Sequence, residues 1–187
     1  MPQQALLVMD VQRSIVARYP DPGYLPRLGA AIDAARAAGL PVIYVVVGFR
    51  PGQPEISVRN KMFGRLAGVA MPAGDEGTQI HPDVAPAQGD IIVTKRRVSA
   101  FAGSDLDMVL RAGGIEHLVL TGIATSGVVL STLRQAADLD FALTVLADGC
   151  LDNDPEVHRV LTEKVFPVQA DVTTVADWAA ATSAALW

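Results

Sequence analysis

Six short runs of apolar and β-branched residues recur along the chain and predict β-strands. The runs are ALLVMD (5–10), PVIYVVV (41–47), DIIVTK (90–95), HLVLTGI (117–123), FALTVLAD (141–148) and DVTTV (171–175). Their nearly continuous apolar character is typical of strands that are covered on both faces. The pattern therefore predicts a buried, mainly parallel sheet.

Helix-like segments separate these runs, at residues 25–39, 104–114, 126–139 and 154–166. Gly39 is placed to end the first of them, and Asp154 followed by Pro155 is typical of a helix start. Because parallel strands are joined by right-handed crossovers, the alternation predicts an α/β fold: a three-layer α/β/α, doubly wound, six-stranded sheet. In such folds the ligand crevice lies beyond the carboxyl ends of the strands.

One segment departs from this alternation, and we expect it to cover the active site. It spans about residues 48–90, is rich in Gly and Pro, and is too long for a simple connection. No internal repeat or second domain is visible, so residues 1–187 are predicted to form a single domain.

Composition narrows the classes of function. The 187 residues are 50% hydrophobic and carry a net charge of −5, with the basic residues scattered rather than gathered in a stripe. This pattern disfavours nucleic acid as a partner. No apolar run reaches the length of about 18 residues that a membrane span needs, and no secretory signal is visible, so we expect a cytoplasmic protein that does not bind a membrane.

Three strand ends carry candidate chemistry. Asp10 ends the first run, Lys95 ends the third, and the fourth enters the turn TGIATSGVV. A carboxylate and an ammonium in an apolar cleft can exchange a proton with a substrate, and unpaired N–H groups of the turn can stabilise an oxyanion. From the residues alone, Asp10 can equally be a turn residue, and Lys95 can belong to a solvated edge.

Together these stretches resemble the isochorismatase-like (cysteine) hydrolase superfamily. The resemblance rests on LLVMDVQ, VTKRRVSAFAGSDL, TGIATSGVVLSTLRQAADLDF and ADGCLDNDPEVH. It implies an Asp, Lys and Cys triad whose first two members are Asp10 and Lys95. The third falls on Val128, because Gly122 and Thr125 match the pattern of the turn while its cysteine is absent.

The same resemblance implies a reaction that needs no thiol. Isochorismatases lack this cysteine and carry a K-x-R-x-S-A-F pattern, which KRRVSAF (95–101) fits. They hydrolyse a vinyl ether, so Asp10 is expected to be the general acid, positioned by Lys95. The substrate-binding residues expected beside them are Gln12, Arg50, Arg97, Phe101, Ala124 and Val128, with Arg97, Arg50 or the further candidate Arg59 binding a substrate carboxylate.

Two alternatives stay open at this point. The first is a catalytically silent binding or scaffold protein on the same fold, which Val128 favours. The second is an amidase with a non-standard nucleophile, for which Cys150 is the only cysteine available. The resemblance places a non-catalytic cysteine there, and free cysteines are usually buried packing residues.

No metal or other cofactor is expected, since His81, His117 and His158 are far apart and show no ligand spacing. The expected partner is a small-molecule substrate. The Ala-rich residues 176–187, which end in Trp187, together with the habits of the family, predict a homodimer or homotetramer.

Overall fold

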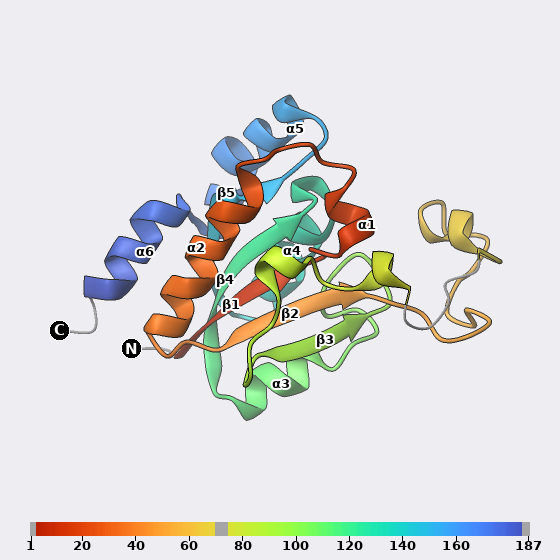
Figure 1. Cartoon of the computed structure of the whole chain (residues 1–187), viewed down its shortest axis with the longest axis horizontal. Helices are drawn as coiled ribbons and strands as arrows, with labels where there is room; N and C mark the ends of the chain where they lie inside the picture. Colours follow the sequence, from red (N-terminus) through yellow and green to blue (C-terminus); the bar gives the residue numbers. More distant parts are fainter. Residues whose placement is uncertain (1–2, 70–74, 185–187) are drawn as a thin grey trace.

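The structure, a computed structural model, describes residues 3–69 and 75–184. Its centre is one sheet of six parallel strands in the order β3-β2-β1-β4-β5-β6 (Figure 1). The strands are β1 (Gln3–Met9), β2 (Val42–Val47), β3 (Ile91–Lys95), β4 (Ile115–Ile123), β5 (Ala142–Leu151) and β6 (Asp171–Thr173). The prediction of a six-stranded parallel sheet is confirmed.

Helices cover both faces of this sheet and complete the three predicted layers. One face is packed by α2 (Tyr24–Ala37) and α6 (Val175–Ala184). The other is packed by α3 (Leu106–Ala112), α4 (Leu130–Asp138) and residues 161–168, which continue α5 (Pro155–Val160). A short helix, α1 (Arg13–Val16), follows β1 and lies near the carboxyl ends of the strands (Figure 1).

Alternation along β1 explains why its sequence is continuously apolar. Leu7 and Met9 enter the core beneath α3 and α4, whereas Leu6 and Val8 enter the core beneath α2 and α6. Successive side chains of a strand point to opposite faces, so a strand between two helical layers buries both sets.

The helix boundaries follow the expected signals with two differences. Gly39 has φ of 68° just after α2, and the Asp154 side chain accepts hydrogen bonds from two backbone N–H groups at the start of α5. The segment predicted as a helix over 126–139 begins with a π-helical turn, Thr125–Val129. The segment predicted over 154–166 changes to a π-helical turn at Leu161 and to a 3₁₀ turn at Phe166, next to Pro167, which has no N–H to continue a helix.

The predicted cover, as far as it is described, contains only short 3₁₀ turns: Phe63–Leu66, Glu76–Thr78 and Pro82–Val84. An isolated bridge between Gln12 and Ile80 ties it to the segment after β1. Residues 70–74 of the cover, and Trp187 of the expected association surface, lie outside the described residues. No helix in the described ranges is long and apolar enough to span a membrane.

The order of the strands defines where a ligand crevice lies. The chain proceeds outward from β1 to β2 and β3, then returns to the other side of β1 with β4. Met9, at the end of β1, is therefore in register with Val45 on one side and with Gly122 on the other. A sheet whose direction of winding reverses between two strands opens a crevice at their carboxyl ends.

Candidate active site

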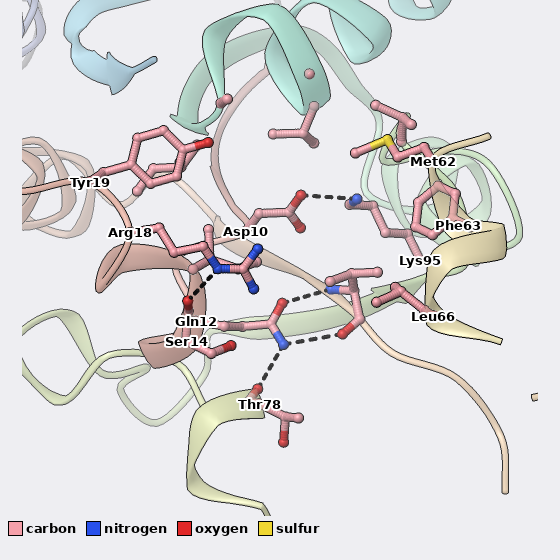
Figure 2. A pocket seen from close by; sticks show the side chains of 17 residues that line it. Asp10, Gln12, Ser14, Arg18, Tyr19, Met62, Phe63, Leu66, Thr78 and Lys95 are labelled. Carbon is pink, nitrogen blue, oxygen red and sulfur yellow. Dashed lines mark hydrogen bonds and ion pairs between the residues drawn. The ribbon is translucent and has the colours of Figure 1, made fainter. Parts of the chain in front are cut away.

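A cavity of about 260 Å³ lies at this crevice, close to the lower end of the volume range of small-molecule sites. Its walls come from the strand ends, from the segment after β1, and from the cover (Figure 2). The lining residues include Asp10, Gln12, Ser14, Arg18, Tyr19, Met62, Phe63, Thr78, Lys95, Ala124, Gly127 and Val128.

Asp10 is the buried acid of the cavity. Its φ of 56° lies in the left-handed region, which turns the chain out of β1, and its N–H donates to the carbonyl of Val45 at 2.8 Å. Asp is among the few residues that adopt this conformation at low cost. Oδ2 lies 3.0 Å from Nζ of Lys95, while Oδ1 is buried and has no hydrogen-bond partner among the described residues.

Burial raises the pKa of Asp10 to about 6, although the charge and hydrogen bond of Lys95 act to lower it. Desolvation outweighs the ion pair because a carboxylate that is 8% exposed has lost most of its hydration. The protonated carboxyl is therefore accessible near neutral pH, which sequence reasoning alone could not decide.

Lys95 is held from two sides at the end of β3. Its Nζ donates to the carbonyl of Arg97 at 2.9 Å as well as contacting Asp10, and its side chain is almost fully buried. Pairing of Val47 with Lys95 fixes the height of the ammonium on the sheet. The two predicted catalytic side chains thus meet in one cavity, and their catalytic roles stay predictions.

The turn after β4 depends on Gly122, whose φ is 141°. A Cβ at this position would lie 2.2 Å from the carbonyl oxygen of Met9, closer than any real contact. The glycine therefore lets β4 pass tightly against β1, and the following residues Ala124, Gly127 and Val128 reach the cavity wall.

The expected unpaired N–H groups of this turn are partly occupied, which corrects the sequence-based expectation. The Ser126 N–H donates to Oδ2 of Asp152 at 2.7 Å, and the Gly127 N–H donates to the carbonyl of Ala124 at 3.1 Å. Asp152 follows directly after β5, so the sheet brings a carboxylate of the chain itself to this helix start.

Gln12 lines the cavity, but its carboxamide is hydrogen-bonded to the backbone of the protein rather than being free for a ligand. Nε2 donates to the carbonyls of Val47, at 3.1 Å, and Thr78, at 2.8 Å, and Oε1 accepts the N–H of Val47 at 2.9 Å. Both N–H donors are therefore committed to joining the end of β2 to the cover (Figure 2).

The arginines expected to bind a substrate carboxylate lie elsewhere. Arg50 pairs with Oε1 of Glu55 at 2.6 Å, and Arg97 donates to the carbonyl of Glu55 at 2.6 Å. Neither lines the cavity, and Arg59 does not line it either. Glu55 belongs to the cover, so Arg50 is paired with a carboxylate of the chain itself and Arg97 with a backbone carbonyl of the same residue.

Phe101 also lies away from the cavity, in the core beneath α3 and α4. Its ring packs against Phe141 with centroids 6.1 Å apart. In the same motif, the Ser99 hydroxyl donates to Gln135, and the Ala100 N–H donates to the Thr132 hydroxyl. Ser99 and Ala100 of KRRVSAF therefore fasten the segment after β3 to α4.

Cys150 is unsuited to act as a nucleophile. It is 2% exposed, lies in the core, and is not part of the cavity wall. Burial raises the pKa of its thiol to about 12, so the thiolate form is negligible near neutral pH.

The structure adds wall residues that the sequence did not single out. Arg18 and Tyr19 come from the connection that follows α1, and Met62, Phe63 and Leu66 come from the cover. The only sequence signal for Arg18 is its place eight residues after Asp10, in the first connection of the sheet. In the described part of the chain, no three His, Cys, Asp or Glu side chains are grouped as a metal site.

Comparisons with known proteins place this fold in a known family. The family model of the isochorismatase domain matches residues 4–177, which defines the protein as a hydrolase of the α/β class. The chain belongs to the isochorismatase family.

A relative in Stutzerimonas stutzeri is named ureidoacrylate amidohydrolase RutB. It is 36% identical over 181 residues, covering 82% of this chain and 72% of the relative. With the family match, this likeness identifies the chain as a hydrolase.

Solved structures agree with this placement. An isochorismatase family protein from Burkholderia thailandensis has a TM-score of 0.84 at 30% identity, covering 98% of this chain and 97% of its own. The N-carbamoylsarcosine amidase of Thermoplasma acidophilum has a TM-score of 0.75 at 29% identity, covering 92% and 96% of the two chains.

Proposed function

We propose that this hydrolase cleaves a small vinyl ether by acid catalysis, with Asp10 as the general acid and without a covalent thioester. The observation that carries the proposal is the state of the Asp10 carboxyl. Oδ2 contacts Lys95, Oδ1 has no hydrogen-bond partner in the described part of the chain, and the pKa is raised to about 6. A general acid works best with a pKa near the working pH.

In this reaction, the C=C electrons of the enol ether take the proton of Asp10 and form a C–H bond. The oxygen-bearing carbon becomes an oxocarbenium ion, to which water adds while returning a proton to the Asp10 carboxylate. The hemiketal then collapses to a carbonyl group: its hydroxyl proton passes to the leaving oxygen as the bond between the carbon and that oxygen breaks. The products are one alcohol and one carbonyl compound, and Lys95 stabilises Asp10 when it is ionised.

Features of the cavity wall support a mechanism without a nucleophile. Val128 presents only hydrocarbon, and Cys150 is buried elsewhere. The wall hydroxyls of Ser14 and Thr78 have no hydrogen bond to an Asp, Glu, His or Lys side chain among the described residues, and Thr78 donates to the carbonyl of Asp75. A serine or threonine nucleophile needs a base within hydrogen-bond reach.

Amide hydrolysis is the second candidate, favoured by the names of the amidohydrolase relative and the amidase neighbour. In that reaction, ionised Asp10 would take a proton from the attacking water. Silent binding on the same fold is the third candidate, since Val128 contributes no reactive group.

The test is a turnover screen of enol ethers, amides and esters with the wild type, Asp10→Asn and a control, Asp33→Asn. Asp33 is an exposed carboxyl on α2 that does not line the cavity. We expect enol ether turnover that falls about 10²- to 10⁴-fold in Asp10→Asn, because the amide cannot donate an acidic proton. The control variant should match the wild type.

Other outcomes select the other candidates. Amide turnover that rises with pH through about 6 favours Asp10 as a base. Binding of a ligand with no turnover on any substrate favours the silent protein. Enol ether hydrolysis that survives Asp10→Asn unchanged shows that the acid is another group.

A further inference from the structure

Arg18 is the one arginine whose side chain lines the cavity, and no acidic side chain among the described residues pairs with it. Its Nε donates to the carbonyl of Ser14 at 3.0 Å, which fixes the guanidinium while leaving the two terminal nitrogens without a hydrogen-bond partner in the described residues. By contrast, Arg13 on the same segment pairs with Glu76 at 3.6 Å and does not line the cavity.

The guanidinium of Arg18 is directed into the space between Asp10 and Gln12, and Lys95 approaches Asp10 from the other side (Figure 2). These three ionisable side chains, Asp10, Arg18 and Lys95, are the charged residues of the described cavity wall. When Asp10 holds its proton, two cations face the cavity without a carboxylate to balance them. An anionic ligand restores that balance.

The rest of the wall is largely apolar, with Ile15, Met62, Phe63 and Val128 among its residues. Arg18 itself is an exposed residue, so the reduced screening comes only from the ligand side, where these apolar groups exclude water from one face of an ion pair. The planar fork of an arginine also matches the two oxygens of a carboxylate.

We propose that Arg18 binds the carboxylate of the substrate, which is a small carboxylic acid whose remaining atoms are compact and mostly apolar. The inference rests on the proposed function, because it places the carboxylate at the α1 side of the cavity while the reacting double bond lies beside Oδ1 of Asp10. Arg18 is a substrate-binding residue in this arrangement and takes no part in proton transfer.

The proposal also explains how the acid keeps its proton during binding. A carboxylate held by Arg18 brings a negative charge to the same cavity as Asp10, and like charges disfavour ionisation of the second group. Substrate binding and protonation of Asp10 therefore support each other.

The experiment measures binding without turnover. Isothermal titration calorimetry at about pH 5.5, where Asp10 is mainly protonated, compares benzoate with its uncharged isostere acetophenone. The proteins are the wild type, Arg18→Gln, Arg18→Lys and the matched control Arg13→Gln. We expect Arg18→Gln to weaken benzoate about 10- to 100-fold, because a charge-assisted bidentate pair is lost, and to leave acetophenone unchanged.

Arg18→Lys should give an intermediate affinity for benzoate, since an ammonium keeps the charge but not the fork. Arg13→Gln should bind both probes as the wild type does. Equal loss of benzoate and acetophenone in Arg18→Gln, or equal binding of benzoate by all four proteins, overturns the assignment.

Failure of the proposed function is distinguishable from failure of this inference. Selective loss of benzoate in Arg18→Gln, together with no enol ether turnover in the wild type, retains the Arg18 assignment and removes the reaction. Where turnover is found, Arg18→Gln should raise KM for a carboxylate substrate and change kcat little. An unchanged KM in that variant overturns the assignment and leaves the acid chemistry standing.

Discussion

The raised pKa of Asp10 can be measured before any substrate is known. Folding moves this pKa from its ordinary value of 3.8 to about 6, so the folded protein holds the Asp10 proton more tightly than the unfolded chain does. The free energy of unfolding that Asp10 contributes is therefore fully present below about pH 3.8 and is lost as the pH rises through about 6.

The magnitude follows from the shift. One pKa unit corresponds to about 1.4 kcal/mol, so the complete effect is about 3 kcal/mol, of which about 2 kcal/mol falls between about pH 4 and about pH 7. Because Asn does not titrate, the stability of wild type minus that of Asp10→Asn should decrease by this amount over that range. Chemical denaturation at a series of pH values measures the difference.

A direct readout accompanies it. The carboxyl carbon of Asp10, assigned by its absence from the NMR spectrum of Asp10→Asn, should titrate near pH 6. In Lys95→Ala the midpoint should move upward, because the charge and hydrogen bond that lower the pKa are removed.

The catalytic consequence has the same sign. If the protonated form is the active one, kcat/KM falls about tenfold between about pH 5 and about pH 7. A stability difference that is flat or increases with pH, or a carboxyl midpoint below about 4, refutes the reasoning, since Lys95 would then outweigh desolvation.

Three further outcomes are expected. Val128→Cys should retain the fold, since the side chains are close in volume, and the new thiol beside Asp10 and Lys95 should be alkylated by iodoacetamide much faster than Cys150; equal rates would contradict this geometry. Gly122→Ala should lower the free energy of unfolding by about 2 kcal/mol or more, because the added Cβ would clash with Met9. The control Gly39→Ala, where no atom lies near the added Cβ, should lose about 1 kcal/mol; similar losses in both variants would show that Met9 moves aside at little cost. Cys150→Ala should leave turnover unchanged, because the thiol is buried away from the cavity; loss of turnover in this variant would show that Cys150 is the nucleophile.

The sequence by itself determined the layers of the fold, and together with the family resemblance it singled out the central pair of the site. Continuous apolar runs such as LLVM define strands buried on both faces, because alternate residues of one strand enter two cores. Asp10 and Lys95 could be brought together from the sequence, since parallel strands end at one edge of a sheet.

Only the tertiary structure decided which arginine faces the cavity and which charge state Asp10 favours. Arg97 lies in the KRRVSAF motif and Arg50 in the cover, but both are bound by Glu55. Because the cover has no hydrophobic periodicity, its sequence does not predict these contacts. Arg18 lines the cavity instead, because the connection that follows α1 forms part of the cavity wall. The pKa of Asp10 depends on the balance between lost hydration and the 3.0 Å contact with Lys95, and both terms are set by packing in three dimensions rather than by the order of residues.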